Sequence, residues 1–255
     1  MTIPNSPSSR WVQFANRDVP LRCWWAEPFA RVNDTESNSL TNRVYIVLPE
    51  VFGVNAWVRS VADRLAAEGY PALALPLFAR TAPDLELAYE PSDLAQGRRH
   101  KDATTADQIL GDVAAALSWL RERHPKATIH VVGFCFGGHA AFLAASLPGV
   151  AAAFDFYGAG VNRMRPGGGE PSLALLPEIQ ARLTCVFGTA DPLIPKEDRE
   201  AIQAALQQQD SSGQRLRSVN CAGANHGFMC EARESFDPQA SAQGWRLLLG
   251  DVPEG

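Results

Sequence analysis

One cysteine of the chain stands in a pattern that can do nucleophilic chemistry. Cys135 is the centre of GFCFG at residues 133–137, which follows the β-type run Thr128–Val132 and precedes the helical pattern Phe136–Leu147. Glycines two residues before and two after a nucleophile let a strand and a helix approach closely around a strained turn. The thiol then lies at a helix N-terminus, where the helix dipole favours the reactive thiolate. We therefore predict that Cys135 is a nucleophile; the alternative is a buried structural cysteine.

A carboxylate and a histidine follow this cysteine in the order that acyl transfer needs. The apolar run Leu183–Phe187 leads to Asp191, and the run Leu216–Asn220 leads to His226. A carboxylate can orient an imidazole, and the imidazole can move protons for a thiol nucleophile. Asp191 could instead be a turn residue before a proline, and His226 a histidine of a surface loop. Their common location after predicted strands favours a catalytic triad of these two residues with the cysteine.

The other histidines fit the role of the base less well. His100 and His124 precede the nucleophile, and His130 lies inside a predicted strand. His139 lies on the predicted helix one turn after Cys135. We expect His139 to be a packed helix residue, with a secondary role in the site as the alternative.

The elements that must position these residues alternate between short β-type runs and longer helical patterns. Strands are predicted at 11–14, 19–26, 43–48, 71–77, 128–132, 150–157, 183–187 and 216–220, and helices at 55–69, 102–123, 136–147, 196–209 and 238–249. This alternation predicts an α/β fold with a mostly parallel central sheet and helices on both faces. We expect one domain over residues 1–255, with 1–10 as a flexible N-terminal tail and 31–42 as a polar loop. The segments 78–101 and 164–177 are expected to be irregular and to shape the pocket.

Composition and charge exclude several classes of function. The 255 residues are 46% hydrophobic and 20% charged, which is typical of a globular protein. A formal net charge of −5 gives no reason to expect nucleic acid or an anionic membrane as a partner. The five cysteines are odd in number and lack a CxxC spacing, so we expect neither a disulfide framework nor a metal site. Without a signal-peptide pattern or a membrane-spanning run, the expectation is a cytoplasmic protein that needs no cofactor.

These residues together resemble the dienelactone hydrolase family (carboxymethylenebutenolidases) of the α/β-hydrolase superfamily. The resemblance spans roughly residues 12–249, and its marks are LPEVFGVN at 48–55, GFCFGG at 133–138, GTAD at 188–191, and NHGF at 225–228 followed by Arg233. It implies an α/β-hydrolase fold and the cleavage of a small-molecule ester or lactone through a cysteine acyl-enzyme with a Cys-His-Asp triad. A carboxylate-bearing substrate is one option within that class.

The resemblance also implies roles for residues outside the triad. Glu50 would hydrogen-bond the resting thiol of Cys135 and help to form the thiolate when substrate binds. The backbone N–H groups of Val51 and Phe136 would form the oxyanion hole. Arg80 would anchor a carboxylate of the substrate.

One position departs from the family pattern. Family members that act on dienelactone carry a second anchoring arginine four residues after the histidine, and Cys230 occupies that position here. The nearest arginine is Arg233, which could bind the substrate instead or be structural. Ester or lactone hydrolysis is therefore a firmer expectation than dienelactone as the substrate.

Two further functions stay open at this stage. One is a short-chain carboxylesterase or thioesterase of the same fold, acting on substrates without a carboxylate. The other is a non-catalytic ligand-binding protein of the hydrolase fold. The presence of Glu50 together with all three triad residues argues against the second, because a degenerate site usually lacks one of them.

Overall fold

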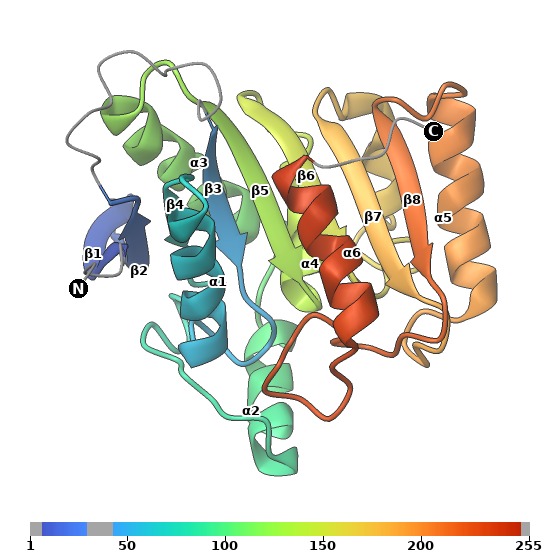
Figure 1. The fold of residues 1–255 in the computed structure, drawn as a ribbon, viewed down its shortest axis with the longest axis horizontal. Helices are drawn as coiled ribbons and strands as arrows, with labels where there is room; N and C mark the ends of the chain where they lie inside the picture. The colour runs from blue at the N-terminus through green and yellow to red at the C-terminus, as the bar shows by residue number, and fades with distance from the viewer. Residues whose placement is uncertain (1–6, 30–42, 251–255) are drawn as a thin grey trace, which may run out of the picture.

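An eight-stranded sheet forms the centre of the part of the chain that the structure, a computed structural model, describes: residues 7–29 and 43–250 (Figure 1). The strands, in the spatial order β1-β2-β4-β3-β5-β6-β7-β8, are β1 (Ser8–Asn16), β2 (Val19–Glu27), β3 (Arg43–Leu48), β4 (Ala72–Ala74), β5 (Thr128–Phe134), β6 (Val150–Phe156), β7 (Arg182–Gly188) and β8 (Leu216–Cys221). The first two strands are antiparallel to their neighbours, and β3 to β8 are parallel.

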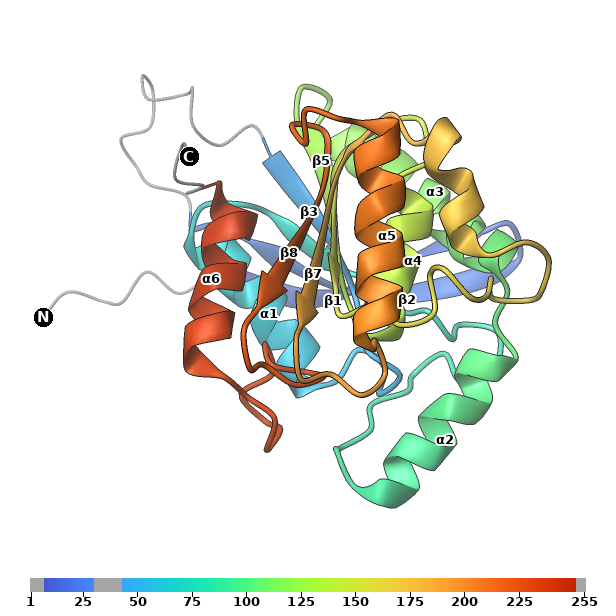
Figure 2. The same cartoon turned by 90° about the vertical axis from the view of Figure 1, so that its right-hand side faces the viewer.

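Helices cover both faces of the sheet. They are α1 (Ala56–Ala67), α2 (Pro91–Asp102), α3 (Ala106–Arg123), α4 (Phe136–Ala144), α5 (Lys196–Gln209) and α6 (Pro238–Leu249), with a 3₁₀ helix η1 at Ser172–Glu178. Helices α1 and α6 lie on one face and α3, α4 and α5 on the other, while α2 stands beyond the carboxyl ends of the strands (Figures 1 and 2). The α/β fold class predicted from the sequence is confirmed.

The central strands are apolar because both of their faces are buried. In β3 every residue after Arg43 is buried, as parallel strands covered by helices on both sides require. The carboxyl ends of the parallel strands meet at one edge of the sheet. The loops that carry Glu50, Cys135, Asp191 and His226 therefore begin at the same edge.

Several predicted boundaries are wrong. Ser8, Ser9 and Arg10 pair with β2 and belong to β1, so the expected tail 1–10 is too long, and its residues 1–6 lie outside the described part. The predicted polar loop 31–42 lies outside it as well. Strand β4 has three residues instead of the predicted seven, and Pro76 lacks the N–H that further pairing would need. The segment 164–177 includes the start of η1.

The largest correction concerns the segment 78–101, which was expected to be irregular. Its second half is the helix α2, which begins with Pro91 after the N-cap Glu90, and Asp93 completes a capping box. Proline suits this first helical position because its missing N–H would have no partner there. Helix α3 begins at Ala106 and not at residue 102, because Thr105 caps it by accepting a hydrogen bond from the N–H of Gln108.

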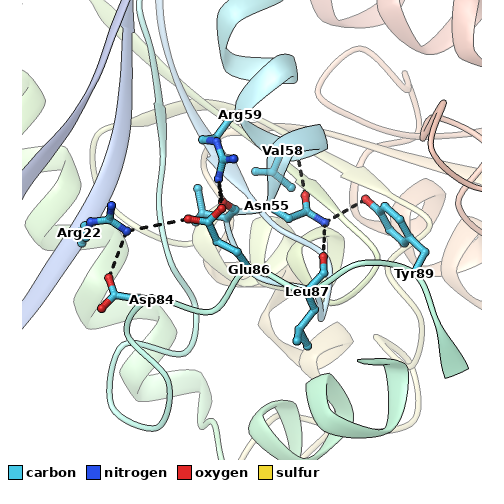
Figure 3. A network of polar contacts seen from close by, with 9 residues as sticks. Arg22, Asn55, Val58, Arg59, Asp84, Glu86, Leu87 and Tyr89 are labelled. Atoms are coloured by element: carbon cyan, nitrogen blue, oxygen red, sulfur yellow. Dashed lines mark hydrogen bonds and ion pairs between the residues drawn. The ribbon is translucent and has the colours of Figure 1, made fainter. Parts of the chain in front are cut away.

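A polar network fixes the segment before α2 against α1 (Figure 3). The Oδ1 of Asn55 caps the first turn of α1, and its Nδ2 donates to the carbonyl of Leu87 (3.1 Å) and the hydroxyl of Tyr89 (3.2 Å). Arg59 of α1 forms an ion pair with Glu86. These contacts hold α2 in place over the sheet edge where the candidate catalytic residues lie.

Within the described ranges we find no helix with the length and apolar character that a bilayer crossing needs.

Candidate active site

Cys135 lies in a strained turn between β5 and α4. Its backbone has φ 55° and ψ −117°, a region that residues with a side chain rarely adopt. A Cβ atom on Gly133 would lie 1.7 Å from the carbonyl oxygen of Gly137, and a Cβ on Gly137 would lie 2.3 Å from that of Leu48. Both glycines are therefore sterically required, as the sequence predicted. The turn leaves the cysteine half-buried at the N-terminus of α4.

The predicted acid and base are joined by a hydrogen bond. Nδ1 of His226 lies 2.8 Å from Oδ2 of Asp191, and both residues are buried. Oδ1 of Asp191 accepts from the N–H of Leu193 at 2.8 Å, so the carboxylate is fixed on both oxygens. Because the carboxylate is an acceptor, Nδ1 is the donor, and Nε2 is left to face the thiol. That Nε2 atom is buried and has no hydrogen-bond partner among the described residues.

His226 and Cys135 also influence each other electrostatically. Burial lowers the pKa of His226, but the negative charge of the Cys135 thiolate, together with the hydrogen bond and charge of Asp191, raises that pKa to about 10. The imidazole therefore holds a proton at neutral pH when the thiolate is formed. An imidazole that can hold a proton beside a thiol is the arrangement that general acid–base chemistry on a cysteine requires.

Glu50 is placed differently from the expectation. It is fully buried, and its Oε1 accepts from Nη1 of Arg233 at 2.8 Å, while Oε2 has no hydrogen-bond partner among the described residues. The expected hydrogen bond to the Cys135 thiol is not formed: Arg233 binds Oε1, and Oε2 has no partner among the described residues. Burial raises the pKa of Glu50, and the positive charges of Arg233 and His226 oppose that rise only in part.

Arg80 does not lie in the site. Its guanidinium forms two hydrogen bonds, of 2.6 and 2.9 Å, with the carboxylate of Asp112 on α3. Asp112 is 1% exposed, and a buried carboxylate needs such a counter-ion. Arg80 is not among the residues that line the cavity of Cys135 and His226 and is bound by Asp112, whereas the resemblance implied contact with substrate.

Cys135 and His226 open into one cavity of about 330 Å³. Its walls are mostly apolar. The described residues that line it are Val51, Phe52, Leu94, Arg98, Lys101, Cys135, Phe136, His139, Ala159, Gly160, Met164, Leu193, His226 and Arg233. A cavity of this size can enclose a small ester or lactone.

Two backbone segments at this cavity suit an oxyanion hole. Phe136 is the first residue of α4, so its N–H has no acceptor within the helix. Val51, from the loop after β3, lines the cavity with it. Helix α2 packs directly on that loop: a Cβ atom on Gly97 would lie 2.3 Å from the carbonyl oxygen of Val51. The loop position thus depends on a glycine in α2.

His139 is a packed helix residue, as expected, and its ring also reaches the cavity wall. Only 2% of it is exposed, Nδ1 lies 3.0 Å from the carbonyl oxygen of Ala159, and Nε2 lies 2.7 Å from the Ser172 hydroxyl. Burial, opposed by the hydrogen bond to Ala159 and assisted by the charge of Lys101, lowers the pKa of His139 to about 4. His139 is therefore neutral at pH 7 and connects α4 to the segment before η1.

Sequence reasoning missed the cations of α2. Arg98 and Lys101 line the cavity together with Leu94 of the same helix. The only signal for this helix was its capping sequence, since α2 contains few apolar residues. Cys230 occupies the position of the second anchoring arginine. Its thiol donates to the hydroxyl of Tyr89 at 3.2 Å, and it does not line the cavity.

Comparison with known proteins agrees with this geometry. The model of the dienelactone hydrolase family matches residues 30–250. A Synechocystis protein provisionally named carboxymethylenebutenolidase is 39% identical over 208 residues, covering 80% of this chain and 83% of the relative. The carboxymethylenebutenolidase of Pseudomonas putida is 31% identical over 163 residues, covering 62% and 65%. The crystal structure of a provisionally named dienelactone hydrolase from Klebsiella pneumoniae has a TM-score of 0.81 at 23% identity, covering 96% and 98%.

Proposed function

Because this chain belongs to the dienelactone hydrolase family, we propose that it cleaves carboxylic ester or lactone bonds through an acyl-enzyme formed on Cys135. One observation carries the proposal: Cys135 and the Asp191-bound His226 line the same cavity. The strained backbone of Cys135 supports it, because such strain persists where the surrounding structure holds a group for chemistry.

In the first half of the reaction, the Cys135 thiolate attacks the carbonyl carbon of the substrate. The N–H groups of Val51 and Phe136 stabilise the negative charge that develops on the carbonyl oxygen. The tetrahedral intermediate collapses, the C–O bond to the leaving group breaks, and His226 gives its proton to the departing alkoxide. The acyl group is then a thioester on Cys135.

In the second half, water replaces the alcohol. The neutral His226 takes a proton from a water molecule, which attacks the thioester carbonyl. When the second intermediate collapses, the C–S bond breaks, the acid leaves, and the thiolate forms again beside a protonated His226. Asp191 keeps the imidazole oriented through both steps.

The charges of the cavity favour a substrate that carries a carboxylate. Arg98, Lys101 and Arg233 line it, and no aspartate or glutamate does so among the described residues. Arg233 is paired with the buried Glu50, and Lys101 is paired at 2.7 Å with Asp102, whose side chain is 69% exposed, so Arg98 is the cavity cation without a carboxylate partner among the described residues. We infer that Arg98, supported by the charge of Lys101, takes the anchoring role that the resemblance had implied for Arg80.

The nucleophile is tested by replacing it. Cys135→Ala should lower kcat on p-nitrophenyl acetate by at least ~10³-fold, since removing a nucleophile that acts with its base costs several orders of magnitude. Cys221→Ser removes a different buried thiol and should keep the activity. Iodoacetamide should label native protein at Cys135, as read by mass spectrometry. A Cys135→Ala protein within a few fold of the wild type contradicts the proposal.

The anionic preference is tested on α2. Arg98→Gln combined with Lys101→Gln should raise KM for an ester of a dicarboxylic acid by roughly tenfold or more, because charge-assisted hydrogen bonds are lost. KM for the uncharged ethyl ester of the same acid, in which the second carboxylate is also esterified, should stay unchanged. Arg99→Gln, an exposed residue of the same helix outside the cavity, is the matched control. Equal effects on both esters would instead favour a short-chain carboxylesterase or thioesterase.

A further inference from the structure

We propose that a second cavity, at the amino ends of the parallel strands, binds a small oxyanion with two or more phosphate or carboxylate groups. This cavity has a volume of about 290 Å³. Four arginines line it: Arg43, Arg182, Arg215 and Arg217. The inference does not depend on the chemistry of Cys135, which lies at the opposite end of β5.

The register of the sheet gathers these side chains on one face. His130 of β5 pairs with Ala152 of β6, which pairs with Arg182 of β7. One step further, Thr184 of β7 pairs with Arg217 of β8. Residues at paired and alternate positions of parallel strands point to the same face. Leu247 and Leu248 near the end of α6 close that face, so the cavity lies at the upper ends of these strands in Figure 1.

The cavity is separate from the candidate active site. Arg43 and Arg182 are the first residues of their strands, whereas Cys135 follows the last residue of β5. His130 lies in the wall of the second cavity, five residues before Cys135. At about 3.3 Å per residue, that separation is roughly 16 Å along the strand. The two cavities have no lining residue in common among those described.

The four arginines have no carboxylate partner in the described part of the chain. Their contacts are neutral: Arg43 donates to the carbonyl of Leu249 and Arg215 to that of Ile179. Nε of Arg217 donates to the Thr184 hydroxyl at 3.2 Å. Most donors of the guanidinium groups are therefore available to a ligand.

Among residues 7–29 and 43–250, no carboxylate pairs with the positive charges of the cluster. Burial and then the charge of Arg182 lower the pKa of Arg217. Burial, with the charges of Arg43 and Arg182, lowers the pKa of His130 to about 4. Guanidinium groups nevertheless stay charged in proteins, so the cluster keeps four positive charges in a partly buried space. A bound anion would remove this mutual repulsion.

His130 forms part of the wall beside the four arginines. It is 2% exposed, it lines the cavity, and its Nδ1 is a buried atom without a hydrogen-bond partner in the described residues. The ring packs against Tyr45 and Phe154, at centroid distances of 5.3 and 6.3 Å, so His130 bounds the cavity while its Nδ1 is not open to it.

The shape and charge of the cavity select the class of ligand. The planar fork of a guanidinium matches the paired oxygens of phosphate and carboxylate groups, and four such groups around one cavity suit an ion of several negative charges. A nucleic acid is a poor fit, because the chain has a net charge of −5.

The test measures anion binding by the full chain. Isothermal titration calorimetry with sodium pyrophosphate and with sodium citrate, at matched ionic strength, should show saturable binding of at least one of them. Pyrophosphate alone would identify phosphate groups as the ligand chemistry, and citrate alone would identify carboxylates. Arg182→Gln and Arg217→Gln should each weaken the binding by about tenfold or more, because each removes charge-assisted hydrogen bonds.

Matched variants separate a site from a general charge effect. Arg246→Gln changes the net charge equally on an exposed position of α6 that does not line the cavity, and its affinity should equal that of the wild type. Arg217→Lys keeps the positive charge but replaces the planar guanidinium by an ammonium group, and it should bind the anion more weakly than the wild type. Absence of saturable binding to either anion, or equal weakening by Arg246→Gln, would overturn the proposal. Hydrolysis of p-nitrophenyl acetate by Arg182→Gln should match the wild type.

Discussion

Replacing Arg233 by methionine should destabilise the protein in a way that depends on pH. The substitution leaves the fully buried Glu50 without its ion-pair partner at 2.8 Å. Breaking a buried ion pair from one side costs about 3–5 kcal/mol, and we expect the lower end because the Arg233 side chain is 22% exposed. The free energy of unfolding at pH 7 should therefore fall by about 3 kcal/mol.

The pH dependence follows from the proton that Glu50 can take up. Burial already raises the pKa of Glu50 in the wild type, and removal of the Arg233 charge raises it further. A carboxyl group whose pKa is higher in the folded than in the unfolded state destabilises the fold increasingly as pH rises above the unfolded value of about 4.3. Because Glu50 can take up a proton instead of staying charged, its destabilising effect cannot exceed about 1.36 kcal/mol for each pH unit above the unfolded pKa of about 4.3. This upper limit is roughly 3.7 kcal/mol at pH 7 and about 1 kcal/mol at pH 5.

Urea unfolding of both proteins between pH 5 and pH 8 measures this difference. The gap between wild type and Arg233→Met should widen as pH rises. Glu50→Gln removes the titrating group, so the gap between Glu50→Gln alone and the double variant Glu50→Gln/Arg233→Met should be independent of pH. A gap of constant size in the single variant would show that the arginine contributes packing alone, and would refute the assignment of a charged Glu50–Arg233 pair.

Three further outcomes are expected. Asp191→Asn should lower kcat on p-nitrophenyl acetate by ~10³–10⁴-fold with an unchanged melting temperature, because His226 loses its orientation; a loss below tenfold would contradict the triad. Gly137→Ala should lower the melting temperature by several degrees in calorimetry, since its Cβ would meet the Leu48 carbonyl at 2.3 Å; wild-type stability would contradict the close approach. For an alkyl ester, kcat/KM should fall as pH rises through about 10, where His226 loses the proton that the leaving group needs; a rate that is still rising at pH 10.5 would contradict this role.

Most strands, and the location of Cys135, Asp191 and His226 after strand ends, could be predicted because each has a local signal, whereas the spatial order of the strands was not predicted. Buried parallel strands are continuous apolar runs, and the glycines around Cys135 are required by a turn that extends over five residues. Helix α2 gave no such signal, because it stands outside the sheet and buries only Gly97. Its capping residues alone marked it, and they were not enough to outweigh its charged composition.

Ion-pair partners could not be predicted, because they depend on side chains far apart in sequence. Arg80 reaches Asp112, 32 residues away, and Arg233 reaches Glu50, 183 residues away. In both cases a buried carboxylate fixes the arginine, and nothing in the local sequence shows which acid will be buried. The roles implied by the family resemblance are therefore least secure for arginines.

The separation of α2 from the turn that carries Cys135 has a consequence for engineering. The cations that line the cavity from α2 and the cysteine turn belong to different elements, which meet at the contact of Gly97 with Val51. A library confined to residues 91–102, with Gly97 kept, would vary the choice of substrate while leaving the bond-breaking residues in place. We therefore expect variants of this helix to change the choice of substrate while Cys135, Asp191 and His226 keep their positions.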